Sequence, residues 1–159
     1  MRQVVELVGL AVAILVIVGA MRRWRAARTG EIALLSRGFA AFLAEVVAQD
    51  GRVALEQYTT DDRTVAMSEL QHLTRHAHDR KLRRDLGRAL DAYDHSLALA
   101  RPHGAAFPDL DDLESPSPQH VLQDEQRIHQ LESAEISLAA FGDVLDRVRA
   151  LRRWALRGG

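Results

Sequence analysis

The chain has no cysteine and few aromatic residues, and both shortages narrow its class. Without cysteine it has neither disulfides nor thiolate metal sites, which is compatible with a cytosolic domain. Phenylalanine, tryptophan and tyrosine make up 5% of the 159 residues, whereas alanine, leucine and arginine are abundant. These three abundant residue types lose little side-chain freedom in a helix, so the composition predicts an all-α protein.

The sequence also lacks a surplus of one charge and any motif that names a reaction. The net charge of −1 provides no global field for nucleic acid, and no nucleic-acid-binding module is recognisable. No glycine-rich phosphate loop or nucleophile with its base can be found. We therefore predict no cofactor, no small-molecule substrate and no enzymatic activity.

One long run, Leu7 to Met21, carries no charge. A membrane-spanning helix needs roughly 20 apolar residues, and Val4 to Met21 provides 18 positions if Glu6 lies at the outer headgroups. A basic and aromatic collar follows at once, formed by Arg22, Arg23, Trp24, Arg25 and Arg28. Because basic residues stay on the cytoplasmic side and tryptophan favours the interface, we predict a single-pass anchor over residues 1–28. It places the N-terminus outside a plasma membrane, such as a bacterial inner membrane, and the C-terminal domain in the cytoplasm.

An exported protein is the alternative for this segment. Leu7 to Val18 is also long enough for the apolar part of a secretory signal, and Val18-Gly19-Ala20 is similar to a cleavage site. The basic charge before the run is weak, since Glu6 offsets Arg2 and the amino terminus. The charge asymmetry across the run therefore favours the anchor.

Residues 29–159 are predicted to form a cytoplasmic domain of three antiparallel, coiled-coil-like helices. The predicted helices cover about 31–58, 61–101 and 118–157. A loop over 102–117 contains all four prolines and an acidic run. The first helix shows one apolar stripe, at Ile32, Leu35, Phe39, Phe42, Val46 and Val53.

Three local sequence signals predict where these helices bend, break or begin. Asp50-Gly51 should weaken or bend the first helix, because glycine costs about 1 kcal/mol against alanine. The apolar stripe of the second helix slips in phase around Asp79 to Lys81, so that helix is distorted there or its packing partner changes. Ser117-Pro118 is a typical start for the third helix.

Apolar residues of the second and third helices are expected to form a seam. Its members are Leu86, Leu90, Tyr93, Leu97, Leu131, Leu138, Phe141, Leu145 and Val148. The second and third helices would exceed the first by roughly 18 Å of helical rise. We expect a protein partner or a second copy of the chain to cover the surplus, and the long loop folding back over it is the alternative. The predicted role is a membrane-anchored accessory or scaffolding subunit that holds this partner.

Two weak chemical patterns support an enzymatic alternative. Glu69 and His72 match the Glu-x-x-His element of di-iron bundles, and His76 lies one turn further, so these three residues are the candidates for metal binding. Arg88 and His95 are seven residues apart, a spacing similar to that of all-helical ribonucleases of the HEPN type. A metal-dependent or ribonuclease-like enzyme at the membrane is therefore the alternative function.

Positive charge is concentrated in two segments of the predicted domain. The first lies in the middle of the second helix, at Arg75, Arg80, Lys81, Arg83, Arg84 and Arg88. The second lies at the C-terminus and surrounds Trp154, at Arg147, Arg149, Arg152, Arg153 and Arg157. A basic, aromatic helix end is suited to anionic lipid or a partner, and it is also typical of an ordinary solvated helix end that complements the helix dipole. The last four residues, Leu156 to Gly159, resemble the tail of ubiquitin-like modifiers, but no β-grasp pattern precedes them.

Overall fold

The computed structural model describes residues 2–100 and 118–157, with side chains for residues 14–100 and 122–154. These residues form five helices and no strand, which confirms the all-α class. The helices are α1 (Arg2–Ala48), α2 (Leu55–Tyr58), α3 (Asp61–Arg75), α4 (Arg80–Leu99) and α5 (Pro118–Arg157).

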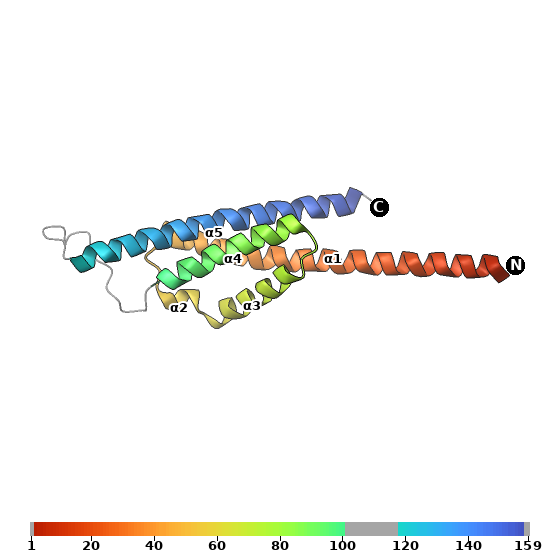
Figure 1. Cartoon of the computed structure of the whole chain (residues 1–159), viewed down its shortest axis with the longest axis horizontal. Helices are drawn as coiled ribbons and strands as arrows, with labels where there is room; N and C mark the ends of the chain where they lie inside the picture. Colours follow the sequence, from red (N-terminus) through yellow and green to blue (C-terminus); the bar gives the residue numbers. More distant parts are fainter. Residues whose placement is uncertain (1, 101–117, 158–159) are drawn as a thin grey trace.

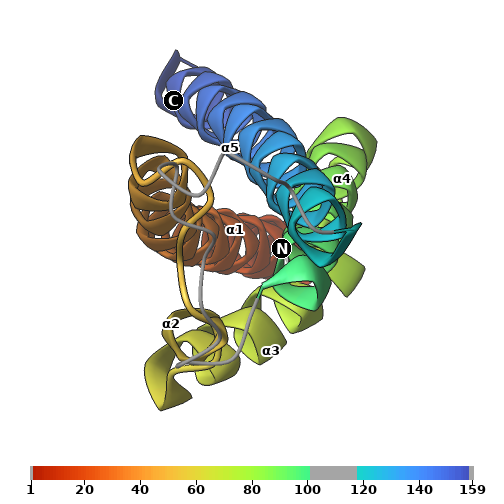
Figure 2. The ribbon, with the colours of Figure 1, turned by 90° about the vertical axis from the view of Figure 1, so that its left-hand side faces the viewer.

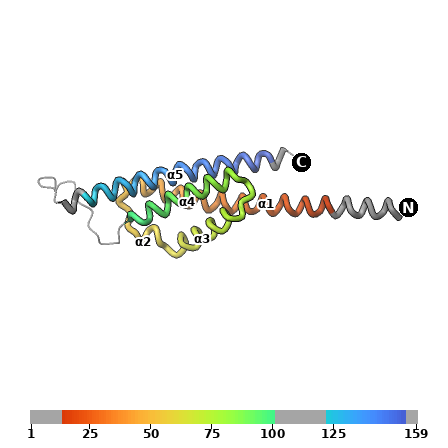
Figure 3. Tube along the Cα trace, viewed as in Figure 1, coloured from red at the N-terminus to blue at the C-terminus, as the bar shows by residue number. Residues whose placement is uncertain are grey.

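Three of the helices run lengthwise through a bundle. Figure 1 shows α1 and α4 running in the same direction and α5 running against both. Figure 2 shows α4 between α5 and α3. In the Cα trace of Figure 3, the coloured part of α1 already extends beyond the other helices. The 47 residues of α1 correspond to about 70 Å at 1.5 Å per residue, so one helix joins the collar to the bundle.

The core of the bundle is built on one face of α1. Four residues of the predicted stripe are buried on this face, namely Ile32, Phe39, Phe42 and Val46. Leu35 is half-buried, and Val53 is buried but lies beyond the end of α1. Aromatic rings connect this face to the neighbouring helices. The Phe39 ring stacks on Phe141 with 5.6 Å between centroids and meets the Tyr93 ring edge-on at 5.0 Å.

The first predicted helix is wrong at its C-terminal boundary. α1 ends at Ala48, and Asp50 and Gly51 adopt the left-handed region with φ of 53° and 72°. The Gly51 amide donates to the Val46 carbonyl at 2.9 Å, which closes the helix. The Asp50-Gly51 pair therefore ends the helix, because both residue types tolerate positive φ.

The second predicted helix, over 61–101, is wrong because it is two helices. The chain turns back at residues 76–79, where the phase of the apolar stripe slips. Asp79 caps α4 by accepting the Leu82 amide at 2.7 Å, and Arg83 donates to the Ala77 carbonyl at 2.8 Å. Backbone groups that lose their helical hydrogen bonds at this break are thus bonded to side chains of the turn and of α4. The expected long hairpin with an uncovered seam does not form, since α3 folds back along the bundle.

The third predicted helix matches α5, Pro118–Arg157. The predicted loop over 102–117, with its prolines and acidic run, lies outside the described residues. α5 is antiparallel to α4, as predicted, but α1 and α4 run in the same direction because α3 returns along the bundle between them in the sequence. At each end of the bundle, residues from distant parts of the sequence therefore lie near one another.

Candidate functional site

The collar residues lie on α1 where this helix leaves the bundle. Arg22, Arg23, Trp24 and Arg25 are exposed, and Arg28 is half-buried. Trp24 is 48% exposed, and the Arg28 guanidinium lies over its ring at 3.9 Å from the centroid. The negative face of an aromatic ring attracts a cation, so the Arg28 guanidinium helps to hold the Trp24 ring in its orientation.

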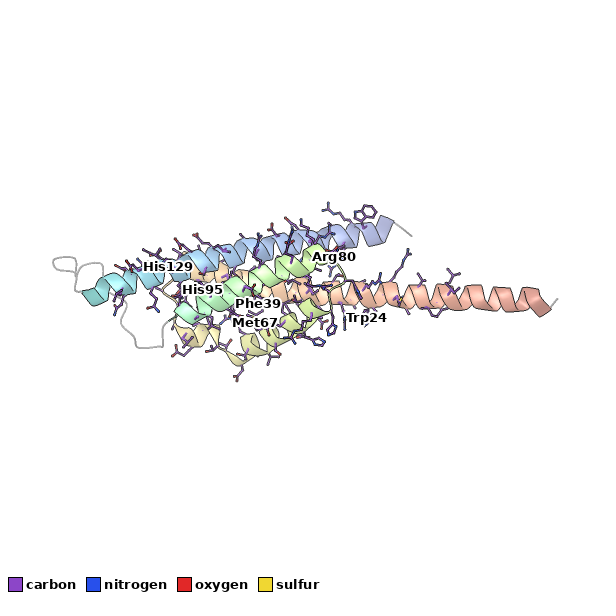
Figure 4. The ribbon with its side chains drawn as sticks, in the orientation of Figure 1. Trp24, Phe39, Met67, Arg80, His95 and His129 are labelled. Carbon is purple, nitrogen blue, oxygen red and sulfur yellow. The ribbon has the colours of Figure 1, made fainter. Side chains whose placement is uncertain are left out.

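The turn between α3 and α4 reaches the same level as the collar. The His78 ring lies 6.2 Å from the Trp24 ring, measured between centroids. Figure 4 places Trp24 and Arg80 at the end of the bundle from which α1 extends, whereas His95 and His129 lie toward the other end. The collar is predictable from consecutive residues, whereas its proximity to this turn has no signal in the sequence.

An ion pair fixes the turn to α5. Arg147 donates to both carboxylate oxygens of Asp79, with N–O distances of 3.1 and 2.5 Å. Hydrogen bonds from Arg147 lower the pKa of the Asp79 carboxyl below its ordinary value, with smaller contributions from the Leu82 amide and from the charge of Arg147. One carboxylate therefore caps α4 and holds α5 against the turn.

The last described turns of α5 return to the collar region. A Cβ atom on Gly30 would lie 3.0 Å from an Arg152 guanidinium nitrogen, so the α5 end is close to α1. Trp154, two residues further along α5, is 80% exposed. The antiparallel direction places the residues after Arg152 alongside the collar, at about 1.5 Å per residue.

Among the side chains that the structure describes, no helix has an apolar stretch long enough to cross a bilayer. Within the run Leu7–Met21, the side chains before residue 14 lie outside that part. The side chains from Ile14 to Val18 are described and are exposed on α1.

The residues considered for metal binding do not form a cluster. Glu69 and His72 are exposed on α3, and His76 follows the helix at its C-terminal cap. The His72 and His76 rings are 4.6 Å apart, but no group of three potential ligands exists within the described residues. The lack of a third ligand removes the geometric support for a metal at this place.

Arg88 and His95, the second candidate pair, both lie on α4. The Arg88 guanidinium pairs with Asp143 of α5 at 2.7 Å, and both side chains are more than half exposed. His95 is exposed further along α4. Arg88 thus connects two helices at the surface.

The residues assigned to partner binding lie in the chain's own interior. Leu86, Leu90, Tyr93, Phe141 and Val148 are buried, and the other four leucines of the seam are half-buried (Leu97, Leu131, Leu138 and Leu145). Because α4 and α5 cover these side chains mutually, and α1 covers them from a third side, this seam is not a free partner surface.

Polar side chains inside the bundle are joined in a network that sequence reasoning missed. The Tyr58 hydroxyl lies 2.8 Å from the Ser96 oxygen, and Ser96 donates to the Gln130 carbonyl at 3.3 Å. The Gln130 amide donates to Tyr58 at 3.3 Å, and Tyr93 donates to the Tyr58 carbonyl at 3.2 Å. The network fixes α2 against α4 and α5, so these polar groups serve the fold.

No protein-family model, curated protein or solved structure matches this chain. The fold and the arrangement of the site define it as a helical bundle carried on an extended first helix.

Proposed function

We propose that the protein is a single-pass membrane protein whose helical bundle acts on the cytoplasmic side as a non-catalytic accessory or scaffolding subunit. The observation that carries the proposal is the uncharged run Leu7–Met21 followed at once by the collar. Arginines resist crossing a membrane, so they hold their side of the run inside. Trp24 suits the interface on the same side.

The continuity of α1 from the uncharged run into the bundle supports this proposal. The uncharged run, the collar and the bundle share a single helix, Arg2–Ala48. Such a helix provides a stiff connection between a bilayer and the bundle, because a continuous backbone hydrogen-bond ladder leaves no flexible linker. A stiff connection suits a protein that holds a partner at a set distance from the membrane.

The buried polar network of Tyr58, Ser96 and Gln130 serves the packing of the bundle. Tyr58, Ser96 and Gln130 are buried, and they use their hydrogen-bonding groups on one another. Ser137 likewise donates to the Ala89 carbonyl of α4 at 2.8 Å. Groups engaged in this way position helices and are not arranged for proton transfer to a ligand.

Alkaline extraction of membranes tests the anchor. The full chain is expected to stay in the membrane pellet, and Leu15→Arg with Ile17→Arg is expected to release it, because each charge in the apolar stretch costs about 3 kcal/mol. Leu34→Arg is the matched control: Leu34 lies on the same helix, is 71% exposed and belongs to the bundle. Release of the unmodified chain by alkali would contradict the proposal.

The partner is tested separately by the size of the detergent-solubilised protein from native membranes. A scaffolding subunit is expected to migrate as a complex larger than one chain. Recovery of a monomer under mild extraction, with full helical content, would contradict the scaffolding role and leave the membrane anchor intact.

A further inference from the structure

Positive side chains from three separate segments meet at one end of the bundle. We define the basic end as the collar residues Arg23, Arg25 and Arg28, the turn-side residues Arg75, Arg80 and Lys81, and the α5 residues Arg152 and Arg153. The net charge of −1 conceals this arrangement, because the acidic residues balance the basic ones only when the whole chain is counted. Figure 1 shows that α1 ends, and α3 and α5 begin, away from the side from which α1 extends. Several acidic residues belong to these helix ends: Asp50 follows α1, Asp61 and Asp62 begin α3, and Asp124 and Glu125 lie near the start of α5.

The three segments reach nearly the same level along α1. His78 in the turn approaches the ring of Trp24, and Arg152 of α5 approaches Gly30. Trp24 is three residues beyond Met21, or about 4.5 Å along a helix. The turn thus lies about 4.5 Å from the level at which the uncharged run stops. Gly30 is about 13.5 Å beyond Met21, and α5 continues past Arg152 to Arg157, about 7.5 Å back toward that level.

Several cations of the basic end have no carboxylate partner among the side chains that the structure describes. Arg80, Lys81, Arg152 and Arg153 make no ion pair with a carboxylate in the described part of the chain. Two nearby carboxylates are already occupied: Asp79 pairs with Arg147, and Asp146 pairs with Arg149 at 2.8 Å. The basic end therefore presents net positive charge toward the side from which α1 extends.

We propose that the basic end docks on the anionic phospholipid headgroups of the leaflet around α1. The proposal rests on the membrane anchor proposed above and adds a ligand for the bundle itself. Each arginine or lysine close to an anionic surface is attracted to it, and the attraction acts within a Debye length of about 8 Å at physiological salt. The exposed Trp154 beside Arg153 suits the same interfacial layer.

Nucleic acid is the other polyanion that such a surface could attract. The position of the charge favours lipid, since the cations surround the helix that carries the apolar run. A flat layer of headgroups perpendicular to α1 would contact the turn and the α5 end together. A nucleic acid would have to enter the same space beside the bilayer.

Lipid selectivity measured on the reconstituted full chain tests the proposal. The chain is placed in mixed vesicles of phosphatidylcholine and phosphatidylserine that contain a trace of spin-labelled lipid of either headgroup. Its only two tryptophans, Trp24 and Trp154, report the encounter by fluorescence quenching. Stronger quenching by labelled phosphatidylserine than by labelled phosphatidylcholine, with the difference lost in high salt, is the expected result.

A charge-reversal pair separates the bundle from the collar. Arg80→Glu with Lys81→Glu leaves every collar residue in place, and acidic residues are favourable at the start of α4, so folding should be retained. The preference for phosphatidylserine is expected to fall about fivefold. The control variant carries Arg37→Glu and Arg52→Glu, which change the net charge by the same amount but lie away from the basic end. Its preference for phosphatidylserine should be unchanged.

The outcomes distinguish the two proposals. If the Arg80 and Lys81 variant keeps the full preference, the collar alone selects the lipid and docking of the bundle is overturned. If neither labelled lipid quenches the tryptophans, the anchor itself is overturned. If an RNA duplex added to the vesicles binds the bundle and abolishes the preference at low salt, the basic end is a nucleic-acid site and the lipid proposal is wrong.

Discussion

Single side chains deep in the bundle carry much of its specificity. Both tyrosines of the chain are buried, and burial raises the pKa of each phenol above its ordinary value. For Tyr58, hydrogen bonds from Gln130 and Ser96 oppose this effect but do not cancel it. The folded bundle can therefore accommodate these phenols only in their neutral, protonated form.

Alkaline titration should therefore unfold the bundle before the tyrosines ionise in place. Above about pH 10 the unfolded chain releases phenolic protons that the folded chain retains, so the free energy of unfolding falls as the pH rises. Absorbance at 295 nm should rise together with the loss of the helical circular-dichroism signal. An added exposed tyrosine, Arg37→Tyr, should ionise near pH 10 with helices intact. Ionisation of Tyr58 and Tyr93 at that pH without unfolding would contradict this expectation.

Asp79 is the second residue whose chemistry can be tested in isolation. Asp79→Ala removes both the cap of α4 and the pair with Arg147, and is expected to cost about 1–3 kcal/mol of stability in urea unfolding of the detergent-solubilised chain. Asp79→Asn keeps a capping oxygen and should cost less. Equal losses in the two variants would assign the whole effect to the ion pair.

The pH dependence of that loss follows from the lowered pKa of Asp79. The unfolded carboxyl binds its proton at a higher pH than the folded one, so its stabilisation is complete above the ordinary pKa near 4. It is lost as the pH falls toward the folded pKa. The difference between the wild-type chain and Asp79→Asn should accordingly shrink below pH 4. A difference that persists unchanged at lower pH would contradict the assignment.

Helices were the most predictable elements of this chain, and their breaks were the least. The heptad pattern predicted α5 from Pro118 to Arg157 because a proline fixes its start and one apolar stripe runs along it. The break at 76–79 could be suspected only from a slip in phase. Its position depends on Asp79 and Arg83 capturing backbone groups, and on Arg147 from a distant helix.

The end of α1 gives a direct test of turn geometry. Gly51→Ala should destabilise the bundle by about 1–3 kcal/mol, because alanine is strained at a φ of 72°. Its Cβ would also lie 3.2 Å from the Arg127 carbonyl oxygen. Gly38→Ala is the matched control within α1: no atom lies near its Cβ position, so it should stabilise the helix by up to about 1 kcal/mol. Equal effects of the two changes on urea unfolding would contradict this account of the turn.

At the scale of the whole molecule, the distribution of charge and the arrangement of the helices say more about function than any short sequence motif. The collar could be predicted because its residues are consecutive. The rest of the basic end could not, since Arg80 and Arg152 approach the collar only after α3 folds back and α5 returns alongside α1. The seam residues were recognised as apolar but assigned to a partner, because sequence spacing cannot tell which helix of a bundle will cover a given stripe.

The most direct test of the membrane account is the side of the bilayer on which each end of α1 lies. The natural chain contains no cysteine, so single cysteines can be introduced at Gln3 and at the exposed Ala44 without background. In spheroplasts of an expressing bacterium, a membrane-impermeant maleimide should label Gln3→Cys at once and Ala44→Cys only after lysis. Labelling of Ala44→Cys in intact spheroplasts would place the bundle outside and contradict the account.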